Sequence, residues 1–418
     1  MKTISFINYI IALLFSLCFS YQLLYLVVPL FKKNKLKKGG RLHNYGVLIA
    51  ARNEETVISQ LIESIKKQSY PKELINIFVV ADNCTDNTAS VAREAGATVW
   101  ERFDKRNIGK GYALDFLLDR IGESYPENAF DGYFVFDADN LLDENYIWEM
   151  NQSFTEGNRI ITSYRNSKNY GDNWISAGNS LWFLRESQYL SRSRMLLGTS
   201  CAVSGTGFLI HNQILKKYGG WKFFLLTEDI EFSISNIIDG ERIAYCESAM
   251  LYDEQPRKFS QSWTQRMRWA KGNLQVCQKY GVNLIKSIFK NRSFASYDMA
   301  ITIFPATILA ALSSAINLFG MAYGIVSKDS IVILISSIME SIMSAYLLFF
   351  VMGFITTITE WKKICSSAFK KILYLFTFPF FMFTYIPIAF AVLFKRVEWK
   401  PIKHKNSITL KEVRELGS

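Results

Sequence analysis

Two long stretches of this chain carry no charged side chain, and they constrain its fold more than any other feature. Residues 3–31 and 299–327 contain no Asp, Glu, Lys or Arg. About 20 consecutive apolar residues suffice for a helix to cross the hydrocarbon core of a bilayer. Because both stretches are longer than that, the sequence excludes an ordinary soluble protein and predicts membrane helices on both sides of a more polar middle block.

A basic cluster directly after the first stretch predicts its orientation. Between positions 32 and 41 the chain carries Lys32, Lys33, Lys35, Lys37, Lys38 and Arg41, with no acidic residue among them. Cytoplasmic flanks of membrane helices are enriched in Lys and Arg. We therefore expect residues 1–31 to be an uncleaved transmembrane anchor with its N-terminus outside, and residues 32 onward to be cytoplasmic. The net charge of +11 then reflects a membrane protein rather than a nucleic-acid partner.

The cysteines and histidines predict no structural zinc site. The six cysteines are scattered without a C-x-x-C pair, and the chain has only three histidines. Free thiols in a reducing compartment explain this pattern.

Residues 299–394 are mostly apolar, and a basic tail follows at 395–418. Ala300–Val326 and Ile331–Thr359 can each span a bilayer. The second segment contains Glu340, which either sits near the outer interface or faces a polar path inside the protein.

The segments between the last predicted span and the tail leave the topology open. Glu360–Lys371 is short, basic and amphipathic, which suits the cytoplasmic interface. Ile372–Phe394 is uncharged and contains Pro379 and Pro387. If it spans, the tail lies outside, whereas the Lys and Arg residues of the tail favour the inside. A re-entrant hairpin broken at the prolines would resolve the conflict, and the sequence does not choose between the two.

The middle block, residues 32–298, alternates between strand-like and helix-like segments. Apolar runs typical of strands lie at Val47–Ala50, Ile75–Val80, Thr98–Glu101 and Tyr133–Asp137. Helical patterns lie between them at Glu54–Lys67 and Thr85–Ala95. Repeated β-α-β units predict a mostly parallel sheet, whose ligands bind beyond the carboxyl ends of the strands.

Polar side chains follow three of these strands at once. Arg52 follows the first strand, Asp82 follows the second, and Asp137-Ala138-Asp139 ends the fourth. Two carboxylates at a strand end can hold a hard cation, and a diphosphate can supply the remaining oxygen ligands. A D-x-D pair alone is often only a solvated turn, but its place downstream of two polar strand ends favours a binding site.

Two later motifs add chemistry to this edge. Thr227-Glu228-Asp229 offers a carboxylate without an obvious cation, which can serve as a general base. Gln265-Arg266-Met267-Arg268-Trp269 combines an amide, a guanidinium fork suited to phosphate and a large aromatic face. Trp269 suits the apolar side of a sugar ring, and it equally suits a helix anchor at the membrane interface.

In this order the motifs resemble those of the family 2 membrane glycosyltransferases, such as cellulose, chitin, hyaluronan and poly-N-acetylglucosamine synthases. The resemblance covers about residues 45–275, and ceramide glucosyltransferases share it. It implies an α/β fold: a cytosolic GT-A-type nucleotide-sugar glycosyltransferase domain with a mostly parallel central sheet. The implied division is an anchor at 1–31, the GT-A domain at 32–298 with interfacial helices near 261–297, a transmembrane region at 299–394 and the basic tail at 395–418.

The resemblance also implies roles on the donor side. Asp82 would contact the uracil of a UDP-sugar, with Arg52 nearby, and Lys110 in Ile108-Gly109-Lys110-Gly111 would lie near the nucleotide. Asp137 and Asp139 would hold the ribose–diphosphate and a Mg²⁺ or Mn²⁺ ion. Gln265 and Arg268 would sit by the diphosphate.

On the acceptor side, the resemblance implies that Asp229 deprotonates the acceptor hydroxyl while Trp269 stacks under the acceptor sugar. Glu228 would lie beside the acceptor. Gly205 and Thr206, in Ser204-Gly205-Thr206-Gly207, match a loop that lines the acceptor site in this family, although a simple turn explains the same four residues.

The expected function is that of an inverting, metal-dependent β-glycosyltransferase in the cell membrane, multi-pass, with a cytoplasmic catalytic domain. It would elongate and export a β-linked polysaccharide such as a β-glucan, with UDP-glucose slightly preferred over UDP-N-acetylglucosamine as donor. The alternative is a single-sugar transferase acting on a membrane lipid. The chain has fewer membrane segments than cellulose or hyaluronan synthases, which raises the prospect of a homodimer or a secretion partner.

Overall fold

A twisted β-sheet forms the centre of the structure, a computed structural model that describes residues 2–32, 39–303, 315–316, 331–402, 404 and 407–417. Within these residues one eight-stranded sheet has the order β3-β2-β1-β4-β7-β6-β8-β5. Its strands are β1 (Tyr45–Ala51), β2 (Ile75–Asp82), β3 (Thr98–Arg102), β4 (Gly132–Asp137), β5 (Leu141–Leu142), β6 (Ile160–Ser167), β7 (Phe208–His211) and β8 (Ile243–Asp253).

The predicted mostly parallel sheet is confirmed. Strands β3, β2, β1 and β4 lie side by side in that order and run parallel to one another, and β6 runs parallel to β8. Strand β7 is antiparallel to both β4 and β6, and the short β5 is antiparallel to β8. All four strands predicted from the sequence are present, each extended by one to three residues.

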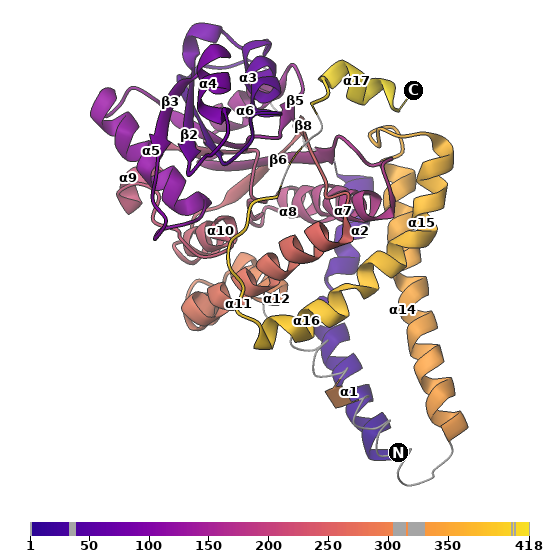
Figure 1. Cartoon of the computed structure of the whole chain (residues 1–418). Coiled ribbons are helices and arrows are strands. Elements are labelled where there is room, and N and C mark those ends of the chain that lie inside the picture. Colours follow the sequence, from indigo (N-terminus) through magenta and orange to yellow (C-terminus); the bar gives the residue numbers. More distant parts are fainter. Residues whose placement is uncertain are drawn as a thin grey trace.

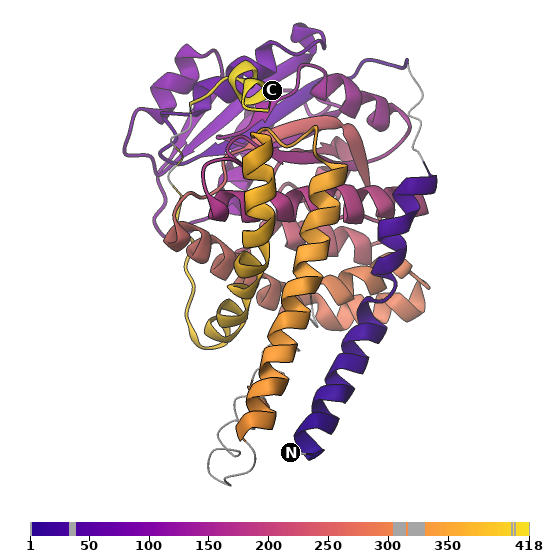
Figure 2. The same ribbon diagram turned by 90° about the vertical axis from the view of Figure 1, so that its right-hand side faces the viewer.

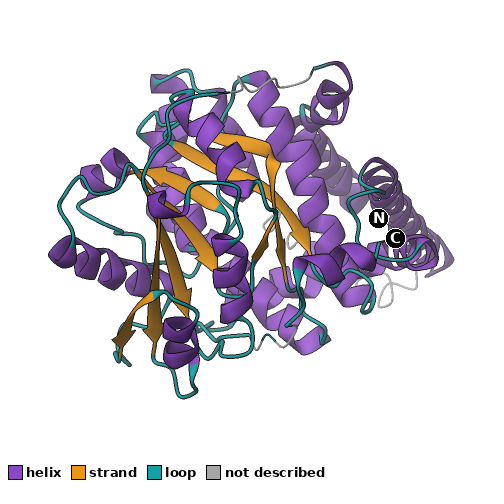
Figure 3. Cartoon of the chain, turned by 90° about the horizontal axis from the view of Figure 1, so that it is seen from above, coloured by secondary structure: helices purple, strands orange, loops and turns teal. Residues whose placement is uncertain are grey.

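Helices cover both faces of the sheet, as the view from above shows (Figure 3). They are α3 (Ile58–Lys66), α4 (Thr88–Glu94), α5 (Lys110–Ser124), α6 (Tyr146–Thr155), α7 (Trp174–Arg185), α8 (Arg192–Leu197), α9 (Asn212–Tyr218) and α10 (Glu228–Ile238), with the short turns η1 (Lys72–Leu74) and η2 (Glu186–Ser191). Because side chains alternate along each strand, Val47 and Ile49 pack in one core cluster and Leu48 in the other. Burial on both faces explains why these strands are continuously apolar.

The first two helices begin later than the sequence predicts. The segments expected to be helical from Glu54 and Thr85 start as turns, and α3 and α4 begin at Ile58 and Thr88. Asn53 and Asn83 adopt positive φ angles of 59° and 53° directly after β1 and β2. Asn is among the few residues that tolerate this left-handed backbone. These turns bend the chain away from the carboxyl ends of the strands and leave those ends open.

Long apolar helices lie on one side of the α/β domain, and α1 and α14 project farthest from it (Figures 1 and 2). They include α1 (Lys2–Phe19), α2 (Gln22–Phe31), α14 (Ile331–Thr359), α15 (Ala368–Phe383) and α16 (Tyr385–Phe394). Among the described residues, Tyr9–Phe31, Met339–Thr359 and Ala368–Phe394 are long and apolar enough to cross a membrane. Most of the predicted span Ala300–Val326 lies outside the described residues.

Two further helices lie between the sheet and this apolar bundle (Figure 1). The predicted interfacial helix Gln261–Tyr280 is part of a longer one, α11 (Phe259–Lys290), and α12 (Phe294–Ile303) follows it. Near its end α11 exposes apolar side chains, including Val282 and Phe289.

The segment predicted to be amphipathic, Glu360–Lys371, has a different structure. Residues 360–367 form turns and bends between α14 and α15. Glu360 is buried there, accepts a hydrogen bond from the Tyr164 hydroxyl of β6 and pairs with Lys363 at 2.9 Å. Because a buried carboxylate needs partners, these contacts dock the turn on the α/β domain.

The segment Ala368–Phe394 lies against the α/β domain at its start and at its end. At the start, a Cβ at Gly171 would come within 3.4 Å of the Lys370 side chain, and at the end Lys271 of α11 donates to the Val392 carbonyl at 3.2 Å. Helix α15 packs on α7, where a Cβ at Gly178 would come within 2.3 Å of the Phe381 ring. After α16 the chain turns back toward the sheet, and α17 (Leu410–Glu415) docks on the domain (Figure 1). Arg414 of α17 pairs with Asp143 at 2.8 Å. This arrangement returns the basic tail to the α/β domain.

Candidate active site

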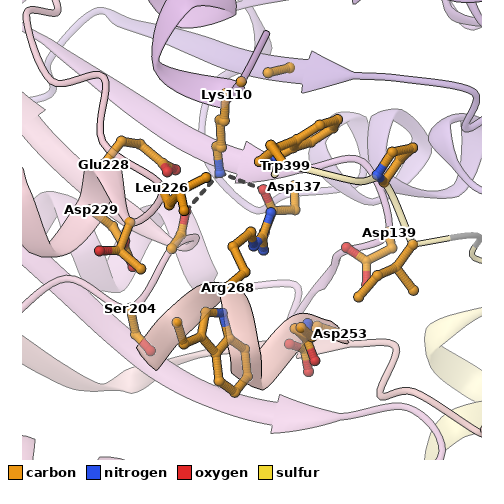
Figure 4. Close-up of a pocket in the computed structure, with 18 of the residues that line it drawn as sticks. Lys110, Asp137, Asp139, Ser204, Leu226, Glu228, Asp229, Asp253, Arg268 and Trp399 are labelled. Carbon is orange, nitrogen blue, oxygen red and sulfur yellow. Dashed lines mark hydrogen bonds and ion pairs between the residues drawn. The ribbon is translucent and has the colours of Figure 1, made fainter. Parts of the chain in front are cut away.

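A cavity of about 310 Å³ lies beyond the carboxyl ends of β1, β2 and β4. Eleven of the side chains or backbone positions predicted for the site line it: Arg52, Asp82, Lys110, Asp137, Asp139, Gly205, Glu228, Asp229, Gln265, Arg268 and Trp269. The twelfth, Thr206, is not a lining residue, but it contacts one: its hydroxyl accepts a hydrogen bond from the Asp137 N–H at 2.9 Å. Figure 4 shows several of these residues converging from different elements.

Asp82 is held by a partner that the sequence did not reveal. The guanidinium of Arg102, at the end of β3, donates to Asp82 Oδ1 at 2.6 Å, and both side chains are buried. Asn83 donates to the same oxygen at 3.0 Å. Since both bonds engage Oδ1, the second carboxylate oxygen is left to face the cavity with a fixed orientation.

Lys110, at the start of α5, connects the D-x-D pair to the glycine-containing loop (Figure 4). Its ammonium group pairs with Asp137 and donates to the Gly205 carbonyl at 2.7 Å. A lysine in this position is a point charge that can turn toward a phosphate.

Asp139 is buried in a charged cluster. Its Oδ2 accepts a hydrogen bond from the Glu254 N–H at 2.8 Å, and the ring of His404 lies 4.0 Å away. Burial alone would raise the pKa of Asp139, but the positive charges of His404 and Lys168 outweigh it and lower the pKa. The cluster therefore keeps this carboxylate ionised.

His404 lies between two carboxylates. Its Nδ1 is 2.9 Å from Glu54 Oε1, and its Nε2 faces Asp139. Burial by itself would lower the pKa of His404, but Asp139 and Glu54 raise it to about 10. Burial raises the pKa of Glu54 to about 7 despite this hydrogen bond.

Glu228 and Asp229 begin α10 on the opposite wall of the cavity (Figure 4). A Cβ at Gly205 would lie 3.6 Å from Asp229 Oδ2, so the loop and this carboxylate are in direct contact distance. Burial raises the pKa of Asp229, and burial together with the charge of Asp229 raises the pKa of Glu228 to about 7. A carboxylate with a raised pKa is a stronger base.

The helical period of α11 places Gln265, Arg268 and Trp269 on one face. Gln265 Oε1 and Arg268 Nε are buried and have no hydrogen-bond partner among the described residues. Arg266 points the other way, stacks on the rings of Phe381 and Tyr385, and donates to Thr384. Buried polar atoms without partners are costly, so the two that face the cavity indicate a polar ligand.

A close approach of two elements brings the acidic motif to α11. At Gly272 a Cβ would lie 2.4 Å from the Thr227 hydroxyl oxygen. Only glycine leaves room for Thr227 here, so α11 and the start of α10 can contact each other.

Sequence reasoning missed the part of the site that comes from the tail. Trp399, Lys400, Pro401, Ile402 and His404 line the cavity. The Trp399 ring lies 5.4 Å from the guanidinium of Arg52 and 6.0 Å from that of Arg268. A Trp and a His within an otherwise basic tail were the available signal.

Two more lining residues follow strands that the sequence analysis did not identify. Arg165 of β6 pairs with Asp253 at the end of β8 at 2.5 Å, and the same guanidinium donates to the Ser204 carbonyl at 2.9 Å. This pair fixes the loop that carries Gly205.

The fold and this site define the class of protein. The chain belongs to glycosyltransferase family 2: residues 43–272 match the family described as "Glycosyltransferase like family 2". The expected resemblance is thus confirmed, and the protein is a glycosyltransferase related to polysaccharide and glycolipid synthases.

The individual relatives are only 23% to 26% identical to this chain. The chain is 26% identical over 307 residues to a probable glycosyltransferase of Bacillus subtilis, covering 68% of this chain and 67% of that protein. It is 23% identical over 231 residues to a poly-β-1,6-N-acetyl-D-glucosamine synthase of Staphylococcus epidermidis, covering 55% of this chain and 54% of the relative. It is 24% identical over 276 residues to a β-monoglucosyldiacylglycerol synthase of Nostoc sp., covering 62% and 55%. The chain thus spans little more than half the length of the last two relatives.

Among solved structures, a mannosyltransferase from Pyrobaculum calidifontis in complex with GDP-Man and Mn²⁺ superposes with a TM-score of 0.59. The match covers 93% of this chain and 99% of that one at 14% sequence identity. It confirms the GT-A-like fold, including the apolar helices outside the α/β domain.

Proposed function

We propose that this protein is an inverting β-glycosyltransferase that uses a UDP-sugar to elongate a polysaccharide at the membrane surface. The observation that carries the proposal is the shared cavity of Asp229, Arg268 and Trp269. A base, a phosphate-binding cation and a sugar-stacking ring are the three groups that glycosyl transfer from a nucleotide donor requires.

The donor would lie along the sheet edge. Asp82, oriented by Arg102, suits the N–H group of uracil, and Lys110 suits the diphosphate. The unpaired polar atoms of Gln265 and Arg268 face the same region and would bind the leaving group. A guanidinium there stabilises the negative charge that builds on the departing UDP.

The residues also fit a divalent cation. Among the described residues no three His, Cys, Asp or Glu side chains form a ready cluster, so a metal ion would need oxygens from the diphosphate. Asp137, Asp139 and His404 would supply the protein ligands, and His404 would release its Nε2 proton on metal binding, since only a neutral imidazole can be a ligand. Metal-binding histidines commonly donate their other ring N–H to a carboxylate, and Glu54 occupies that position for His404. A bound Mg²⁺ or Mn²⁺ would neutralise charge on the diphosphate.

The transfer itself would be a single displacement. Asp229 takes the proton of the acceptor hydroxyl while that oxygen bonds to the anomeric carbon, and the bond from this carbon to the diphosphate breaks. A single displacement inverts the configuration at the anomeric carbon. An α-linked donor therefore gives a β-linked product.

The proposed setting is the cell membrane, with the GT-A domain at 32–298 in the cytoplasm and the anchor at 1–31. We propose that residues 368–394 enter the bilayer and return, because Lys370 near their start and Val392 near their end both contact the α/β domain, and α17 beyond them docks on it. The tail at 395–418 is then cytoplasmic, which agrees with its basic charge.

A lipid acceptor is the second candidate, favoured by one contact. Trp182, which lines the cavity, packs on Tyr385 of α16 with ring centroids 5.9 Å apart, so the cavity adjoins an apolar helix. A lipid headgroup could enter from this side.

Product analysis tests both candidates. The purified full-length protein is incubated with Mg²⁺ or Mn²⁺ and either radiolabelled UDP-glucose or UDP-N-acetylglucosamine, in the presence of membrane lipid. High-mass product that resists lipid extraction and is cut by a β-specific glycanase supports polysaccharide synthesis. A discrete organic-soluble product with one sugar would overturn it in favour of the lipid acceptor.

A further inference from the structure

One part of the cavity wall takes no part in the reaction proposed above. Trp182, Phe183 and Glu186 line the cavity from the end of α7 and the start of η2. The turn η2 is π-helical, a wider and rare form that is frequently found at functional sites. Because Trp182 and Glu186 are four positions apart, their side chains share one face of this helix.

The loop at Ser204 places Glu186 next to the proposed base. The Glu186 carboxylate lies beside the Ser204 hydroxyl, and Arg165 holds the Ser204 carbonyl at 2.9 Å. The next residue, Gly205, is the one in contact distance of Asp229. Along the cavity wall the residues therefore follow in the order Asp229, Gly205, Ser204 and Glu186. Two loop residues, Gly205 and Ser204, separate Glu186 from the base.

Aromatic rings continue from this point toward the membrane helices. The Phe183 ring lies under the guanidinium of Arg165 at 3.7 Å and packs edge-on against Trp269 at 5.8 Å. Trp182 contacts Tyr385 of α16. The wall thus runs from the base, past a carboxylate, to an indole at the edge of the apolar bundle.

We propose that Glu186 and Trp182 form a second acceptor subsite, which binds the sugar ring next to the one whose hydroxyl Asp229 deprotonates. A carboxylate accepts strong charge-assisted hydrogen bonds from sugar hydroxyls, and an indole face covers the apolar C–H side of a ring. The subsite rests on the proposed function, and it makes a saccharide of two or more units the preferred acceptor.

The test compares acceptors of one and two sugars. The full-length enzyme is given UDP-glucose with aryl β-glucoside or aryl β-linked diglucosides of 1,3, 1,4 and 1,6 linkage, and UDP-N-acetylglucosamine with the matching acetamido acceptors. The readout is the ratio of kcat/KM for the best disaccharide to that for the monosaccharide. A general loss of folding lowers both values and leaves this ratio unchanged.

We expect the wild-type ratio to be about ten or more, as one or two hydrogen bonds to a charged group would give. Glu186→Gln and Trp182→Ala should bring it close to one, and Trp182→Phe, which keeps an aromatic ring against Tyr385, should lower it partly. Glu123→Gln on the exposed face of α5 and Trp148→Phe, both outside the cavity, are the matched controls and should keep the wild-type ratio.

Three results would overturn the subsite. If Glu186→Gln and Trp182→Ala keep the wild-type ratio, or if the wild type elongates both acceptors equally, the polysaccharide function stands and the subsite does not. If the wild type transfers sugar only to lipid and to none of the saccharides, both the function and the subsite fail.

Discussion

The guanidinium of Arg52 lies 5.4 Å from the ring of Trp399, so a residue just after the first strand meets one from the far end of the chain. The guanidinium of Arg268 lies 6.0 Å from the same ring, and Figure 4 shows both Trp399 and Arg268 among the residues that line the cavity. In the proposed function, the donor site therefore consists of the sheet edge and a tail segment that covers it.

The Trp399→Ala variant tests whether the tail segment contacts the donor. Trp399→Ala removes two cation–π contacts, each of which is worth about 0.5 to 2 kcal/mol. We expect UDP to bind about five- to tenfold more weakly by calorimetry. Trp148→Phe, outside the cavity, is the control and should bind UDP like the wild type. An unchanged UDP affinity in Trp399→Ala would mean that the tail does not contact the donor.

Asp229→Asn should abolish transfer while UDP binding stays close to the wild type. The amide keeps the shape of the side chain but cannot take a proton, and the loss of a general base costs about two to four orders of magnitude in rate. Turnover is measured as UDP release with acceptor present. A variant with near wild-type turnover would remove Asp229 from the mechanism.

The pH dependence of the reaction follows from Asp229 and its neighbour Glu228. Burial raises the pKa of Asp229 and of Glu228, the latter to about 7. Because the base must be deprotonated, kcat/KM should fall as the pH drops through the raised pKa of Asp229, which lies above the usual range of an aspartate. Glu228→Gln removes a neighbouring negative charge, which lowers the pKa of Asp229 and should move this acidic limb to lower pH. A limb that stays in place would show that another group controls it.

Asp139→Ala and His404→Ala should both raise the Mn²⁺ or Mg²⁺ concentration needed for half-maximal activity, by about tenfold or more, since each removes a proposed ligand. His211→Gln, which alters a histidine outside the cavity, is the matched control. Wild-type activity that survives EDTA would contradict the metal role altogether.

Trp269→Ala should reduce transfer to an acceptor more than hydrolysis of the donor, because the stacking platform serves the acceptor. The ratio of glycosylated product to free sugar measures this directly. If Trp269 were only an interface anchor, protein yield would fall while that ratio stayed constant.

The residues at the edge of the sheet could be predicted from the sequence because strand and helix patterns depend on residues that are close together along the chain. Strand patterns and β-α-β order bring Arg52, Asp82 and Asp137 to one edge whatever the rest of the chain does. The period of α11 likewise places Gln265 and Trp269 on one face. The two uncharged stretches likewise predicted membrane helices on both sides of the middle block.

Other parts of the site depended on contacts between distant segments, which no local period encodes. Asp82 meets Arg102, Asp139 meets His404, and the turn after α14 is docked through Glu360. Whether residues 368–394 cross or return was undecided in the sequence because apolar length alone fits both. Packing of α15 on α7 and docking of α17 through Arg414 bring the tail back over the cavity. Only the tertiary structure could place the tail there, because the free energy that favours this position comes from surfaces that meet after the chain has folded.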